Sequence, residues 1–160
     1  MRISTSPEGF SDWTELVNLV RDAFAYMDGR IDPPSSLTRM GIEEFKAKAE
    51  REVLIVAYEG QMLIGCAFAE LREDCVYVGK VAVAQSARGK GVARGLIEAA
   101  EEFAKTHSKQ ALELQTRVEL VENHATFGAL GFIKVAETAH PGYSRPTSIT
   151  MRRPVECSAA

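Results

Sequence analysis

Residues 80–93 constrain the fold of this chain more than any other stretch, because a strand pattern passes through a short turn directly into a helix pattern. The segment reads KVAVAQSARGKGVA. Small residues at the first turn of a helix leave backbone N–H groups uncovered, at the positive end of the helix dipole. Arg88 and Lys90 add positive charge at the same place, so the segment predicts a phosphate-binding turn. The helix that follows has one apolar face, made of Val92, Leu96, Ala99, Ala100 and Phe103.

The length and charge of the chain limit the classes of function open to it. A chain of 160 residues with 46% hydrophobic residues predicts one domain over residues 1–153, followed by a frayed tail at 154–160. The net charge of −3 argues against a broad basic surface, so no nucleic-acid partner is expected. No apolar run has spanning length and residues 1–5 do not resemble a secretory signal, so we expect no membrane association and a cytoplasmic location.

Three cysteines are spread widely along the chain. They form no CxxC pair and no His/Cys cluster, so neither a disulfide framework nor a metal site is predicted. Cys66 and Cys75 are interpreted as small apolar residues within strands.

Hydrophobic periodicity predicts a mixed sheet flanked by helices. Asp12 and Glu15 have the spacing of a capping box at the start of a first helix. A strand, a helix of about sixteen residues and a second strand make a βαβ unit, so two strands should run parallel. Gly131 is expected to end the last helix in the left-handed conformation. Helices are expected at 12–27, around 42–49, at 92–106 and at 123–130, and strands at 53–58, 62–70, 75–83, 111–118, 133–139 and 147–152.

Two common phosphate motifs do not fit the turn. A P-loop requires glycine where Ala84 stands and a hydroxyl residue where Gly91 stands. A dinucleotide fingerprint requires a third glycine at position 94, which is arginine, and it follows the first strand of an alternating α/β sheet.

The segment 88–93, RGKGVA, is similar to the Arg-x-x-Gly-x-Gly/Ala signature of the GNAT superfamily of acyl-CoA-dependent N-acetyltransferases. The order of predicted elements resembles that fold over nearly the whole chain, and residues 123–132 resemble the family's last helix with its Gly-Phe ending. The resemblance implies an α/β (α+β) domain. Its mixed, mostly antiparallel sheet would contain one parallel, splayed strand pair and be flanked by helices.

The resemblance also implies acetyl-CoA as cosubstrate and an amine of a small molecule or peptide as acceptor, with possible homodimers. A backbone N–H of Val81 or Val83 would stabilise the oxyanion. Asn123 could take the place of an Asn found in some relatives, and the alternative is a simple N-cap. The residues implied to bind the cofactor are Val81, Ala82 and Val83 along the pantetheine, Arg88, Gly89, Lys90, Gly91, Val92 and Ala93 at the pyrophosphate, and Asn123.

The catalytic acid and base are less well indicated. Many relatives have a tyrosine that protonates the thiolate at the position of Phe127, which has no proton to give. Relatives with a carboxylate base in the fourth strand have it where Tyr77 stands. We favour Tyr77 acting with Glu113 through a water chain. The other titratable candidates are Glu70, Glu119, His124 and His140.

Two further functions remain open on the sequence. A CoA-binding sensor with impaired catalysis would explain Phe127, and a nucleotide-binding protein would use the same turn. The loops at 26–32 and 140–146 are expected to select the acceptor. In them Asp28 and Asp32 could attract a cationic amine, while Tyr143 and Arg145 could hold an aromatic or anionic group.

Overall fold

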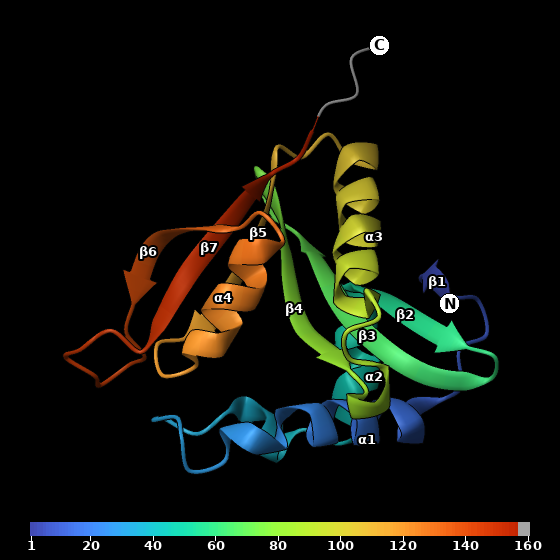
Figure 1. Ribbon diagram of the computed structural model, residues 1–160, viewed down its shortest axis with the longest axis horizontal. Helices are drawn as coiled ribbons and strands as arrows, with labels where there is room; N and C mark the ends of the chain where they lie inside the picture. The colour runs from blue at the N-terminus through green and yellow to red at the C-terminus, as the bar shows by residue number, and fades with distance from the viewer. Residues whose placement is uncertain (157–160) are drawn as a thin grey trace.

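Seven strands form one mixed sheet in the computed structural model, which describes residues 1–156 (Figure 1). The strand order is β1-β2-β3-β4-β5-β7-β6, and every neighbouring pair is antiparallel except β4 and β5. This topology confirms the predicted fold class and the predicted parallel pair. The strands are β1 (Arg2–Thr5), β2 (Val53–Glu59), β3 (Met62–Leu71), β4 (Cys75–Val83), β5 (Ala111–Arg117), β6 (Ile133–Thr138) and β7 (Ser148–Pro154).

The helices cover both faces of the sheet. α1 and α2 pack on one face, around a buried cluster that includes Leu16, Phe45 and Phe68. α3 and α4 lie on the opposite face, toward the viewer in Figure 1. The helices are α1 (Trp13–Phe24), α2 (Ile42–Arg51), α3 (Val92–Thr106) and α4 (Val121–Ala129), with 3-10 turns η1 (Ala25–Met27), η2 (Ser36–Arg39) and η3 (Gln85–Ala87).

α3 buries a slightly different face from the one its periodicity predicted. Ile97 and Ala104 are fully buried, whereas Ala99 and Phe103 are only partly buried. α3 contacts all of β1 through β5, so the face that it buries is set by its seat across five twisted strands and not by its periodicity alone.

β4 and β5 separate after three paired residues. The ladder joins Cys75 to Ala111 and ends where Tyr77 faces Glu113. Beyond that point β4 stays on β3 and β5 stays on β7, so a gap opens between the two parallel strands. The backbone edges that face this gap have no ladder partner across it, which makes them available to a ligand.

The beginning of α1 differs from the prediction. Asp12 is the N-cap residue, but its side chain makes no capping hydrogen bond. Instead Asp12 Oδ2 accepts a hydrogen bond from the Tyr58 hydroxyl at 2.5 Å. The predicted capping box is therefore wrong, because a tertiary partner on β2 takes the carboxylate.

The ends of two other segments are also corrected. α4 begins at Val121 with Leu120 as its N-cap, so Asn123 lies inside the first turn and does not cap the helix. β7 continues to Pro154, and the next residue, Val155, is buried and donates its N–H to the Gln110 carbonyl at 2.9 Å. The predicted frayed tail thus includes two ordered residues, and its residues 157–160, with Cys157, lie outside the described range.

Candidate active site

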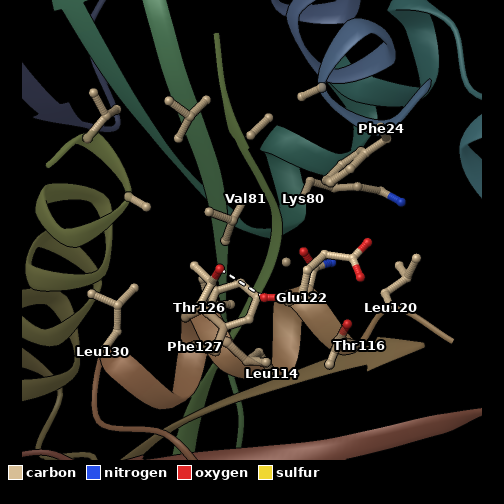
Figure 2. Close-up of a pocket in the computed structure, with 18 of the residues that line it drawn as sticks. Phe24, Lys80, Val81, Leu114, Thr116, Leu120, Glu122, Thr126, Phe127 and Leu130 are labelled. Atoms are coloured by element: carbon tan, nitrogen blue, oxygen red, sulfur yellow. Dashed lines mark hydrogen bonds between the residues drawn. The ribbon is translucent and has the colours of Figure 1, made fainter. Parts of the chain in front are cut away.

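A cavity of about 1020 Å³ occupies the gap between β4 and β5. α1 and η1 border it on one side of the sheet, and α3 and α4 border it on the other (Figures 1 and 2). Figure 2 shows Val81 and Phe127 near its centre, with Leu130 on the α3 side and Phe24 on the α1 side. The cavity therefore passes through the sheet, so two ligands could meet in it from opposite faces.

Most of the residues predicted from the sequence line this cavity. Lys90 and Glu113 do not belong to its lining. The predicted residues that do are Tyr77, Val81, Ala82, Val83, Arg88, Gly89, Gly91, Val92, Ala93 and Asn123.

The turn before α3 has the geometry of an anion site. Gly89 and Gly91 have φ angles of 78° and 81°, which belong to the left-handed region where glycine carries little strain. Gly91 is the N-cap of α3, and no side chain caps the helix. No acidic residue stands in the first turn of α3, and a Cβ at Gly91 would meet nothing within 4 Å. The first N–H groups of α3 thus have no side-chain cap, and phosphate binding there stays a prediction.

A β-bulge shapes β4 beside the gap. Cys66 of β3 pairs with Ala82 and Phe68 pairs with Gly79, so Lys80 and Val81 together face a single residue of β3. Lys80 has a φ of 51°, which is unusual for a residue with a side chain. The bulge shifts the alternation of side chains by one residue: Val78 and Val81, three positions apart, both pack in the α3-side cluster, and Ala82 belongs to the α1-side cluster.

Tyr77 and Glu113 are neighbours in the parallel register, but an arginine links them. The Arg72 guanidinium lies 4.0 Å from the centre of the Tyr77 ring and donates from Nη1 to Glu113 Oε2 at 3.1 Å. Arg152 Nε donates to the other Glu113 oxygen at 3.0 Å. Burial raises the pKa of the Tyr77 hydroxyl, which disfavours its anionic form. This arrangement does not favour proton abstraction by the pair, because both Glu113 oxygens already accept from arginine.

Asn123 reaches a protein partner from within α4. The Tyr26 hydroxyl donates to its Oδ1 at 3.2 Å, and its Nδ2 donates back to the Tyr26 oxygen at 2.9 Å. Alongside, Arg30 forms a two-point ion pair with Glu122, at 2.6 Å and 3.1 Å. These contacts hold the segment after α1 against α4 and border the cavity on that side.

The two loops expected to select the acceptor bind each other. Asp32 accepts from the Tyr143 hydroxyl at 2.6 Å and from Arg145 Nη2 at 3.1 Å. None of these three residues belongs to the cavity lining. The two loops therefore contact each other outside the cavity lining, and their role in selecting the acceptor stays a prediction.

Three polar residues of the cavity were missed or left without a role in the sequence analysis. Lys80, Thr116 and Arg117 line it from β4 and β5. Thr116 Oγ1 is buried and has no hydrogen-bond partner among the described residues, so it is available to a ligand or a water molecule in the cavity. The Gly79-Lys80 interruption of an apolar strand could have signalled a bulge, but nothing local showed where the lysine would point.

Comparisons with known proteins identify the family. Residues 13–132 match the model of the acetyltransferase (GNAT) family, and the chain belongs to that family. This result confirms the family and the enzyme class that the sequence predicted.

Individual relatives agree with this assignment. N-acetylaspartate synthetase from Danio rerio is 31% identical over 109 residues, which are 65% of this chain and 39% of the relative. The chain thus spans well under half of that relative's length. The ribosomal-protein-S18-alanine N-acetyltransferase from Escherichia coli superposes with a TM-score of 0.70 at 16% identity, over 99% of this chain and 97% of the other. The PaiA N-acetyltransferase from Thermoplasma acidophilum, solved in complex with coenzyme A, has a TM-score of 0.78 at 14% identity, over 96% and 99%.

Proposed function

We propose that this protein transfers an acetyl group from acetyl-CoA to the primary amine of a small molecule or peptide. One observation carries the proposal. The uncapped N-terminus of α3 and the gap between β4 and β5 open into a single cavity. An anion held at the helix and an extended arm lying in the gap would belong to one ligand, and coenzyme A has that shape.

The residues available for coenzyme A fit its chemistry. The backbone N–H groups around residues 88–93 would hold the pyrophosphate, with the side chains of Arg88 and Arg94 nearby in the lining. The unpaired edge of β4 from Val81 to Val83 would hydrogen-bond the amides of the pantetheine arm. Lys90 lies outside the lining, so its contribution would be through charge alone.

Acetyl-CoA supplies an activated acyl group: the amine nitrogen bonds to the carbonyl carbon, the C–S bond breaks, and the products are an amide and a free thiol. The chain must receive the amine in its neutral form and polarise the carbonyl. The Val81 N–H stands at the bulge, where it could donate to the carbonyl oxygen as negative charge builds there. Water would take the amine proton, because Glu122, the one carboxylate that lines the cavity in the described chain, is already paired with Arg30.

Tyr77 and Glu113 remain the candidates that the sequence indicates for acid–base catalysis, and their contacts limit the role that each could have. The Tyr77 hydroxyl, protonated at neutral pH, would order water or substrate at the cavity wall. Glu113 would hold Arg72 against the Tyr77 ring. Tyr77 would then act by hydrogen bonding, and Glu113 by positioning.

The enzymatic function can be separated from a CoA-binding sensor, the reading that Phe127 favours. Phe127 lines the cavity and packs edge-on against Phe132 at 5.9 Å, so no proton donor stands at that position. The test is thiol release from acetyl-CoA with a panel of amines, together with calorimetric binding of CoA. Turnover supports the transferase. Tight CoA binding without turnover on any amine would support the sensor instead.

Several finer expectations belong to the same proposal. The Danio rerio relative is an N-acetylaspartate synthetase, so aspartate belongs in the panel of amines. Acetyl-CoA as the donor, a cytoplasmic location and homodimers remain predictions. Within residues 1–156, no helix is long and apolar enough to cross a membrane, and no group of three or more His, Cys, Asp or Glu side chains could hold a metal ion.

A further inference from the structure

Positive charge predominates where the cavity faces α1 and α2. Lys48, Lys80 and Arg117 line it from α2, β4 and β5. Across the described part of the chain, the lining contains one carboxylate, Glu122, and its charge is matched by the two-point ion pair with Arg30.

The three cations differ in how their charge is compensated. Lys48 Nζ forms an ion pair with Glu52 at 2.8 Å. Arg117 donates to the carbonyl oxygens of Pro33 at 2.7 Å and Pro34 at 3.4 Å, which are neutral acceptors. Asp32 and Glu119 lie near enough to act on Arg117 electrostatically, but neither forms an ion pair with it.

Among the three, Lys80 is the cation without a direct hydrogen-bond or ion-pair partner in the described residues. It makes no hydrogen bond through its ammonium group and no ion pair with any side chain that the structure describes. It is half-buried, and its pKa is lowered first by burial, then by Lys48, and also by Arg117, while the carboxylate of Glu52 acts in the opposite direction. Glu52 forms its ion pair with Lys48, so the half-buried ammonium of Lys80 has no anion in direct contact, and an anionic ligand would stabilise it.

The position of Lys80 relates that anion to the reaction. Lys80 precedes Val81 at the bulge, and Figure 2 shows its side chain extended alongside Phe24, on the α1 side of the cavity. Arg88 and Arg94, which would face the pyrophosphate, lie at the α3 end. An anion at Lys80 would therefore belong to the acceptor, next to the place where its amine reacts.

We propose that Lys80 binds a carboxylate of the acceptor, so that this enzyme acetylates an amine bearing negative charge, such as an amino acid. The proposal rests on the transferase function and narrows its substrate class. Arg117 adds to the positive electrostatic potential on the α1 side of the cavity, while its hydrogen bonds hold the loop at Pro33. Polyamines, aminoglycosides and lysine side chains of basic peptides would be repelled by this end of the cavity.

The test compares acceptors with and without a carboxylate. Thiol release from acetyl-CoA is measured with alanine against alaninamide, in which an amide replaces the carboxylate, and with the dication putrescine. Alanine should have a kcat/KM roughly 10- to 100-fold higher than either, because a charge-assisted hydrogen bond to a half-buried ammonium is gained. A preference for alaninamide or putrescine would overturn the proposal.

Variants of Lys80 locate the effect. Lys80→Met keeps the length of the side chain and the Cβ at the positive φ, so no new backbone strain is introduced. It should reduce the charge preference to within about threefold by raising KM for the carboxylate acceptor, and Lys80→Arg should keep most of the preference. Lys46→Met is a matched change on α2 outside the cavity lining, and it should leave kcat/KM for both acceptors unchanged. An unaltered preference in Lys80→Met would overturn the proposal.

A binding measurement keeps this inference separable from the transferase function. If no amine is turned over, the transferase proposal fails, and the Lys80 site is then judged by the thermal shift that N-acetylaspartate and succinate produce in the presence of CoA. A shift in the wild-type protein that disappears in Lys80→Met supports the carboxylate site. Absence of any shift, or an equal shift in both proteins, overturns it.

Discussion

Replacing Gly91 by leucine tests the binding of coenzyme A most directly. Gly91 is the N-cap of α3 with φ 81°, and its Cβ would project into open space on the cavity side. A leucine there would occupy the volume in front of the first N–H groups of α3, where the pyrophosphate is expected. The substitution also adds backbone strain, so its effect on folding must be measured separately from its effect on binding.

Gly9 offers a control matched for that strain. It has φ 72°, it is exposed, and a Cβ would likewise meet nothing within 4 Å, yet it does not line the cavity. A side chain in the left-handed conformation costs about 1–2 kcal/mol. For a chain of this size each kcal/mol lowers Tm by about 2–4 °C, so both Gly9→Leu and Gly91→Leu should lose about 2–8 °C.

Only Gly91→Leu should lose coenzyme A. Displacing one phosphate-to-amide hydrogen bond removes about 1.5–3 kcal/mol, which raises the Kd for CoA roughly 10- to 150-fold. Isothermal titration calorimetry measures Kd, and differential scanning fluorimetry measures Tm on the same samples. If Gly91→Leu bound CoA as tightly as Gly9→Leu, the pyrophosphate would not lie on these amides and the reasoning would be refuted.

Three further outcomes are expected. Phe127→Tyr adds a proton donor where the thiolate is expected and should raise kcat severalfold. Phe127→Leu should leave kcat nearly unchanged. An unchanged kcat in the tyrosine variant would exclude this position from acid catalysis. Arg30→Met breaks the exposed pair with Glu122, so steady-state kinetics should show a higher KM for the acceptor with little change in Tm, and an unchanged KM would contradict a bordering role for that pair. Burial lowers the pKa of His140, so near and below about pH 6.5 the unfolded chain binds more protons than the folded chain. The free energy of unfolding should therefore decrease as pH falls, until the pH is below the folded pKa. Tm measured from about pH 8 down to about pH 5 should decrease less in His140→Gln than in the wild type, and parallel curves would contradict this.

Local features of the site could be predicted from the sequence because their causes lie within a few residues. The glycines before α3 adopt positive φ, and the strand that precedes them ends where the apolar run ends. The parallel pair followed from the strand–helix–strand order alone. Each of these depends on backbone preferences and short spacing, which the tertiary structure left unchanged.

The failures share one cause, which is competition from partners distant in the sequence. Asp12 had the spacing of a cap but is taken by Tyr58, 46 residues away. Asn123 had the chemistry of a cap but lies within the first turn of α4 and is paired with Tyr26, 97 residues away. Glu113 remains a candidate, but its two oxygens accept from Arg72, in the turn after β3, and from Arg152 of β7, which the sequence did not indicate. Nothing within a short window indicates such partners.

The amino-acid sequence by itself determined the glycine turn before α3, the order of elements and the family, since these depend on glycine conformation, periodicity and a contiguous motif. Only the tertiary structure decided which cations line the cavity. Lys80 and Arg117 come from strands 37 residues apart, and they share one cavity because a bulge redirects the first and the splayed gap exposes the second. Both the bulge and the gap result from packing of strands against opposite layers of helices, and that balance is a property of the whole fold.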